Sequence, residues 1–338
     1  MKQKKILLVV AATLAAAPMM THAANLEVYG QLRMAVTAAD NGDSSPGQED
    51  STVAISSNDS RIGFRGNEKL KDNLTGLFQA EIQYNVDEDD GYTSWSSGRD
   101  SFVGLQGNWG TALVGRLSTP YKNATGLFDP FTDTEADFNG SGDKIISHNT
   151  RANNAIAYVS PNRNGLNYAL AYATSVQNDE LPQTSADADQ DALSLSVTYE
   201  EGPLMVMGAY EKIEDEKAFA FGAQFAVSDK TRIGVLIDDV DDQDNTVYAS
   251  LNHKLRDDYT LSAALAFRGD SGNGVNDGME YFALGVSHSY TPTVSVFAQV
   301  AMVSNDSDST VGLKKNEAVT GEDISALSVG MNISFSTK

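Results

Sequence analysis

The chain has 338 residues, of which 41% are hydrophobic, and a formal net charge of −22 at pH 7. It contains no cysteine, which excludes a disulfide framework and thiolate metal sites. The acidity argues against nucleic-acid binding, because contact with a phosphate backbone requires a basic surface.

Residues 1–23 have the layout of a secretory signal peptide. Three lysines among the first five residues precede an uncharged, mostly apolar run over 6–17, and residues 21–23 form a cleavage site. The run is too short to span a membrane as a helix. We expect cleavage after Ala23. The loss of three lysines and no acid takes the net charge from −22 to −25.

From residue 24 onward, apolar and polar residues alternate with a period of two. In 26–36, Leu26 and Val28 alternate with Glu27 and Gln31. Such alternation predicts a β-strand with one apolar and one polar face. The pattern continues through pairs of strands in 61–84, 101–117 and 151–176, then through the segments after 191. It ends in LSVGMNISF, 327–335, and predicts sixteen strands in all.

The connections between these strands alternate in length. Short turns are predicted at 71–74, 107–110, 160–165, 200–203, 228–231, 256–259 and 291–293. Longer polar loops are predicted at 38–58, 87–98, 118–147, 177–191, 212–217, 238–245, 269–278 and 304–322. This alternation is typical of an all-β, sixteen-stranded antiparallel up-and-down transmembrane barrel with short periplasmic turns and long external loops. We expect residues 24–338 to form one such barrel domain.

A secreted β-sandwich is the alternative fold, and it would make the protein a secreted β-rich binding protein or adhesin. So many strands would normally divide into two sandwich domains, yet the chain has no linker or shift in composition. The polar strand faces are also rich in Ser, Ala, Gly, Asn and Gln rather than in Lys, Glu and Thr. We therefore favour the barrel.

Three strings carry a resemblance to a known family: SRIGFRGNEKLKDNLTGLFQAEIQYN, SFVGLQGNWGTALVGRLSTPY and NTRANNAIAYVSPNRNGLNYALAYA. They resemble the general porins of Gram-negative outer membranes, and the likeness in layout runs from residue 25 to 335. The resemblance implies a sixteen-stranded barrel in the outer membrane. It also implies a homotrimer and passive diffusion of small hydrophilic solutes and ions.

The resemblance further implies that the loop 118–147 folds into the barrel and narrows it. The basic side of that constriction would be Arg61, Arg99 and Arg151, which alternation alone also places on polar strand faces. The acidic side would come from Asp129, Asp133, Glu135 and Asp137. Further lumen-facing charges are expected at Glu27, Arg33, Arg65, Glu81 and Arg116. These charges nearly balance, which predicts a modest preference for cations.

The sequence has no motif typical of an enzyme or of cofactor binding, and the histidines lack metal-ligand spacing. We expect no catalysis, cofactor or metal site. The acidic outer loops are either solvated or bridged by divalent cations to lipopolysaccharide phosphates, which makes outer-membrane lipids and lipopolysaccharide the expected surroundings. The family usually ends on an aromatic residue, whereas Phe335 is followed here by Ser336, Thr337 and Lys338.

Overall fold

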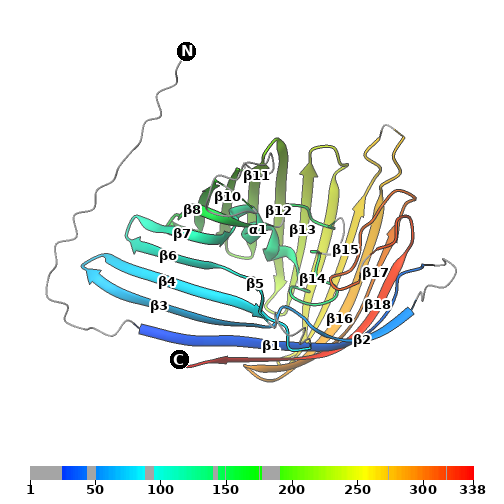
Figure 1. The fold of residues 1–338 in the computed structure, drawn as a ribbon, viewed down its shortest axis with the longest axis horizontal. Helices are drawn as coiled ribbons and strands as arrows, with labels where there is room; N and C mark the ends of the chain where they lie inside the picture. The colour runs from blue at the N-terminus through cyan, green and yellow to red at the C-terminus, as the bar shows by residue number, and fades with distance from the viewer. Residues whose placement is uncertain are drawn as a thin grey trace, which may run out of the picture.

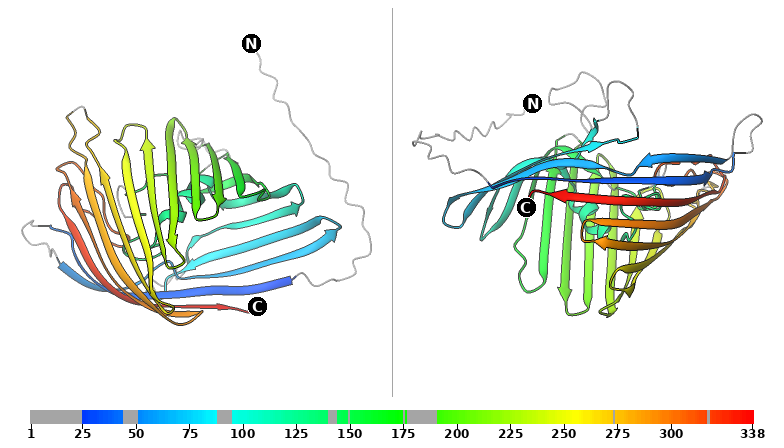
Figure 2. Two further views of the ribbon diagram at one scale, coloured as in Figure 1. Left: turned by 180° about the vertical axis from the view of Figure 1, so that it is seen from behind. Right: turned by 90° about the horizontal axis from the view of Figure 1, so that it is seen from below.

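The computed structural model describes residues 25–43, 51–87, 95–139, 144–148, 150–174, 176, 191–272, 274–316 and 318–338. The predicted signal peptide lies outside these residues. The described strands form one antiparallel sheet that closes into a barrel (Figure 1). Closure occurs where β1 pairs with β18, and both views in Figure 2 show β1 in blue beside β18 in red.

The strand bounds within the described residues are β1 Asn25–Asp40, β2 Ser51–Ser57, β3 Arg61–Lys71, β4 Leu74–Tyr84, β5 Trp95–Gly98, β6 Ser101–Gly107, β7 Gly110–Ser118, β8 Arg151–Val159, β9 Leu166–Ala173, β10 Ala192–Glu201, β11 Leu204–Ile213, β12 Glu216–Ser228, β13 Thr231–Val240, β14 Thr246–Arg256, β15 Tyr259–Arg268, β16 Met279–Thr291, β17 Val294–Asn305 and β18 Ile324–Ser336. Two short helical segments, α1 Pro120–Thr125 and η1 Gly126–Phe128, lie between β7 and β8.

The described segments make sixteen barrel strands, because two of those strands are interrupted. Both β2 and β3 pair with β1, and both β5 and β6 pair with β4. The predicted sixteen-stranded barrel is therefore confirmed. The sequence pattern had assigned 51–57 and 95–98 to loops. The first interruption falls at Asp59, whose φ is +53°, and the adjacent Ser60 hydroxyl binds the backbone N–H and C=O of Arg33.

The predicted alternation of faces is clearest in β18. Leu327 and Val329 are 53% and 56% exposed on the outer surface, whereas Ser328 between them is buried and hydrogen-bonds to Thr37. Apolar side chains facing outward with polar side chains facing inward suit a barrel wall in lipid. After Phe335 the chain continues the sheet, since Thr337 N–H donates to Val28 C=O at 3.0 Å.

The hydrophobic core lies inside the barrel, where the connection between β7 and β8 folds inward. Its aromatic side chains Tyr121, Phe128, Phe131 and Phe138 are buried against small and apolar residues of β11 to β17. The inner faces of β3 and β4 remain polar. The interior thus has one side filled by the loop and one side left to charged residues. No helix in the described part of the chain is both long and apolar enough to cross a membrane.

Candidate functional site

The inward loop is attached to the wall at its two ends. Thr119 caps α1 by accepting from Lys122 N–H, and Pro120 occupies the first turn, where no N–H is needed. Tyr121 N–H donates to the Ser194 hydroxyl at 3.0 Å, and Tyr121 O–H donates to the Asp238 carboxylate on β13. The same carboxylate accepts from Ser147 N–H at 3.0 Å. One wall residue therefore holds both ends of the loop.

Glycines in the wall receive the loop's aromatic rings. The ring of Phe128 lies where a Cβ atom on Gly222 would stand, 2.3 Å away, and it also contacts Gly234. The ring of Phe131 lies 2.9 Å from the corresponding point on Gly285. Only glycine allows approaches this close, so these positions fix where the loop seats against β12, β13 and β16.

A Gly222→Ala variant is expected to unseat Phe128, because an added methyl group cannot share the space of the ring. Overpacking of this kind costs roughly 1–3 kcal/mol. The change is measured as a lower urea midpoint of unfolding and as faster proteolysis between 118 and 150. Gly208→Ala is the control, since its added Cβ meets Phe221 at 3.7 Å, an ordinary contact. Equal effects of the two substitutions would contradict the seating role.

The loop tip is held by two arginines from the opposite wall. Arg61 on β3 forms an ion pair with Asp133 at 2.6 Å. Arg33 on β1 donates to the C=O groups of Thr132 and Asp133 at 2.6 and 2.9 Å. The Asp137 carboxylate accepts from Asp133 N–H at 2.8 Å and keeps the turn closed. The tip therefore crosses the lumen from the β11–β17 side to β1 and β3.

A cavity of about 500 Å³ lies between this loop and the polar wall. Its charged lining consists of Asp59, Arg61, Glu81, Arg99, Asp100, Lys122, Asp129, Asp133, Asp137, Arg151 and Lys314. The wall contributes from β3, β4 and the break after β5, and the inward loop contributes the opposite side. Charges of both signs thus line one open space.

The three predicted basic residues all line the cavity but take different partners. Arg61 meets the loop through Asp133. Arg99 is buried and pairs with Glu81 on the wall at 2.6 Å. Arg151 pairs with Asp100 at 2.9 Å. Their role at a constriction stays a prediction.

The four predicted acidic residues divide into two pairs. Asp133 and Asp137 lie at the tip and contact cationic side chains. Burial and then the neighbouring Asp137 hold the pKa of Asp129 well above its usual range, and its carboxylate accepts from Phe131 N–H at 2.8 Å. Burial also raises the pKa of Glu135, against the opposing effect of Asn316. Glu135 points to the loop 306–323 rather than into the cavity.

The remaining predicted lumen residues lie at several levels of the barrel. Glu27 and Arg65 form a bidentate pair with hydrogen bonds of 2.8 and 2.9 Å. Glu81 accepts from Arg99 and from Tyr29 O–H. Arg116 donates to Gly98 C=O at 2.7 Å and to Asn153 at 2.5 Å, and it does not contribute to the described lining of the cavity.

Sequence reasoning missed Asp59, Asp100, Lys122 and Lys314. Asp59 and Asp100 lie at the breaks in the two interrupted strands, which alternation does not reveal. Lys122 belongs to a helical turn inside a segment predicted as an acidic loop. Lys314 lies in the segment 304–322, predicted to be an external loop. Its only signal is a pair of adjacent lysines in an otherwise acidic part of the chain.

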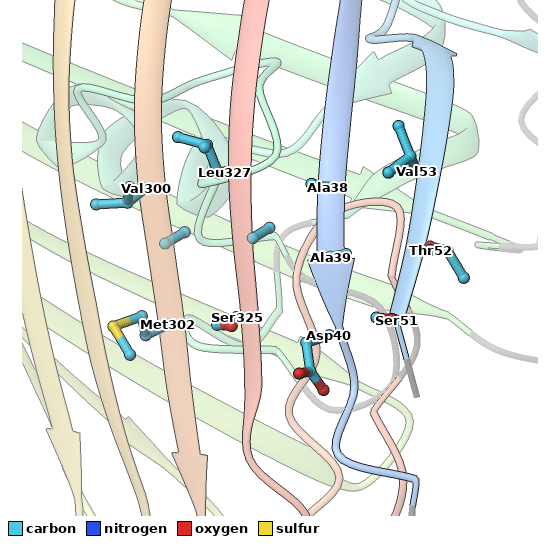
Figure 3. Close-up of a pocket in the computed structure, with 12 residues that line it drawn as sticks. Ala38, Ala39, Asp40, Ser51, Thr52, Val53, Val300, Met302, Ser325 and Leu327 are labelled. Atoms are coloured by element: carbon cyan, nitrogen blue, oxygen red, sulfur yellow. The ribbon is translucent and has the colours of Figure 1, made fainter. Parts of the chain in front are cut away.

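A second hollow lies on the outside of the wall and not in the lumen (Figure 3). Its lining comes from the ends of β1, β2, β17 and β18, with Val53, Met302 and Leu327 exposed on the outer surface. Small side chains such as Ala38 and Ser325 form its floor. This hollow contains none of the opposing charges that mark the inner cavity.

Comparison with known proteins gives one family. The family described as Gram-negative porin matches residues 8–308. The chain is 31% identical over 195 residues to a chitoporin of Vibrio furnissii, covering 55% of this chain and 50% of that protein. It is 30% identical over 211 residues to the major outer membrane protein P.IB of Neisseria meningitidis serogroup A, covering 61% of this chain and 60% of that protein. The matches span about half to three fifths of these relatives.

Solved structures share the fold over most of the chain. An anion-selective porin from Comamonas acidovorans has a TM-score of 0.75 at 21% identity, covering 92% of this chain and 100% of that one. The trimer form of OmpT from Vibrio cholerae has a TM-score of 0.67 at 16% identity, covering 92% and 99%. At these identities the likeness concerns the fold alone.

Proposed function

The chain belongs to the Gram-negative porin family, and we propose that it forms a water-filled channel in the outer membrane for passive diffusion of small hydrophilic solutes and ions. No chemical step is involved. The proposal rests above all on the cavity between the inward loop and the polar wall, which Arg61 and Arg99 of the wall line together with the acidic tip of the loop. Opposing charges across a narrow lumen act on passing ions as a transverse field.

The first test is conductance of the purified barrel in planar lipid bilayers. Discrete steps of current are the expected result. If the correctly folded barrel gives no conductance, the channel function is wrong. Heat-modifiable migration on a gel shows correct folding independently of any current.

Replacing Arg61, Arg99 and Arg151 together with Gln is expected to increase cation preference, because three positive charges leave the cavity while its carboxylates remain. The measurement is the reversal potential under a salt gradient. Arg163→Gln is the control, since this residue lies exposed in a periplasmic turn. An unchanged reversal potential in the triple variant would show that these arginines do not face the ion path.

We propose only a modest cation preference for the unmodified channel. The cavity lining holds five cationic and six acidic side chains, a sum of −1 if all are ionised. Charges on outer loops lie more than a Debye length of about 8–10 Å from the narrow point and are largely screened there. The net charge of the whole chain therefore does not set the selectivity.

Ion selectivity is expected to change with pH near neutrality through Lys122. Burial, and then repulsion by Arg151, lowers the pKa of Lys122 to about 7. The amine is charged below this pH and neutral above it, so cation preference should rise between pH 6 and pH 8. Reversal potentials measured across this interval test the effect. Lys122→Met should be cation-preferring already at pH 6, with little further change; a variant that keeps the wild-type pH dependence contradicts the assignment.

Several expectations about assembly accompany this function. We propose that residues 1–23 are cleaved as a signal peptide and that the mature barrel is a homotrimer, as in the trimer form of OmpT. Divalent cations would link acidic outer loops to lipopolysaccharide phosphates. N-terminal sequencing, migration of the unheated protein on a gel and the effect of a chelator on extraction from membranes test these three points separately.

A further inference from the structure

Residues 309–316, in the loop between β17 and β18, reach into the barrel and bind the tip of the inward loop. Lys314 N–H donates to Glu135 C=O at 3.2 Å. Lys315 N–H donates to the Glu135 carboxylate at 3.1 Å, and the Asn316 side chain donates to the same oxygen. Val311 and Leu313 are fully buried in the core inside the barrel. The middle of this loop is therefore buried inside the barrel and not solvated.

The side chain of Lys314 joins three segments that are far apart in the sequence. Its ammonium lies 3.2 Å from the Asp59 carboxylate, at the break between β2 and β3. It lies 3.5 Å from the Asp137 carboxylate, at the tip of the inward loop. The three side chains are at most 19% exposed. Burial alone lowers the pKa of Lys314, but Asp137 and Asp59 raise it above its ordinary value, so the amine stays charged.

The carboxylates around this ammonium form a compact cluster. One oxygen each of Asp59, Asp133 and Asp137 can be chosen so that all lie within 4.8 Å of one another. Arg61 pairs with Asp133 and leaves two carboxylates to Lys314. Like charges this close are tolerated only beside a cation. Lys314 thus reduces the net charge of the cluster from −2 to −1 when Arg61 is counted.

We propose that Lys314 is a selectivity-determining residue of the channel, and that the loop carrying it is a second wall of the constriction. This inference rests on the proposed channel function. Lys314 compensates carboxylates that face the ion path and so limits cation flow through the narrow point. Without its ammonium, Asp59 and Asp137 attract cations, and the cluster with Asp133 offers oxygen ligands of the kind that bind calcium.

Lys314→Met is the variant that tests the proposal, with Lys315→Met as the matched control. The control removes the same charge from an adjacent, exposed position. The loss of a positive charge about 4–8 Å from the ion path raises the local concentration of monovalent cations roughly two- to fivefold in a water-like dielectric, and the ratio of cation to anion permeability by at least as much. We expect this rise for Lys314→Met and a much smaller one for Lys315→Met. Millimolar calcium should reduce the conductance of Lys314→Met and leave the wild type unaffected.

Two further variants separate charge from packing. Lys314→Arg keeps the charge and should retain wild-type selectivity. The double variant Asp59→Asn with Lys314→Met removes one charge of each sign and should return the reversal potential close to that of the wild type, even if the single variant assembles poorly. A wild type that does not conduct contradicts the channel function itself. A conducting wild type with equal selectivity in Lys314→Met and Lys315→Met overturns the role of Lys314 alone.

Discussion

A Val329→Arg barrel is expected to fail to insert and fold in lipid vesicles. Val329 lies midway along β18 and is 56% exposed on the outer surface. An arginine at the bilayer midplane of a barrel costs about 2–4 kcal/mol, and less near the interfaces. That cost is a large share of the usual net stability of a folded protein. The measurement is the fraction of heat-modifiable, protease-resistant barrel after dilution from urea into vesicles.

Ser262→Arg provides the control for the lipid-facing substitution. Ser262 lies on β15 and lines the lumen near the loop tip, where water can solvate a guanidinium group. This variant should fold with nearly the yield of the wild type. Equal losses for the two variants would contradict the assignment of faces, because the same side chain would then be equally costly in lipid and in the lumen.

Replacing Asp129–Asp137 with a Gly-Gly bridge is expected to raise single-channel conductance about twofold or more, because the segment that crosses the lumen is removed. The same change leaves Arg33, Arg61 and Lys314 without their partners on the tip. The enlarged channel should therefore shift from modest cation preference toward anions. Larger sugars should also enter, as measured by swelling of proteoliposomes.

Shortening the outer loop 269–278 to the same bridge is the control for this deletion. None of its described residues lines the inner cavity, so conductance and reversal potential should stay close to those of the wild type. An unchanged conductance in the tip deletion, with a normally folded barrel, would show that another part of the chain sets the limiting radius.

The sequence predicts the wall of this protein better than its interior. In β18 a strict period of two separates lipid-facing from inward residues, because every second side chain meets hydrocarbon. In β13 the run Ile233 to Ile237 is apolar at nearly every position, since Leu236 faces the packed loop while Ile233 and Ile237 face outward. Alternation cannot distinguish an inward residue covered by a loop from one that faces lipid.

The charged site was only partly predictable for a related reason. Arginines on strands follow the alternation, so Arg61 could be placed on the inner face from its neighbours alone. Side chains on loops follow no such rule, and the positions of Glu135 and Lys314 depend on contacts between segments about 180 residues apart. The breaks beside Asp59 and Arg99 also limit the prediction, because the residues that face inward change from odd to even positions, or the reverse, at each break. Counting in steps of two from Arg99 predicts that Phe102 faces lipid. In the structure Phe102 instead packs with inward residues.

The closing seam of the barrel also bears on the order of folding. At the seam, β1 pairs with β18, and Thr37 meets Ser328 across 291 positions of sequence. Contacts between residues so far apart in the sequence form late, because the entropic cost of bringing the two chain ends together must be met before strand pairing gives any stabilisation. Lys314 lies just before β18, so it is expected to reach Asp59 only at about the time the ends of the chain meet. The balance of charge in the lumen is then completed in the last stage of folding. A chain truncated before β18 should therefore lack both a sealed wall and the ion pair between Lys314 and Asp59, which makes assembly and selectivity depend on the same final strand.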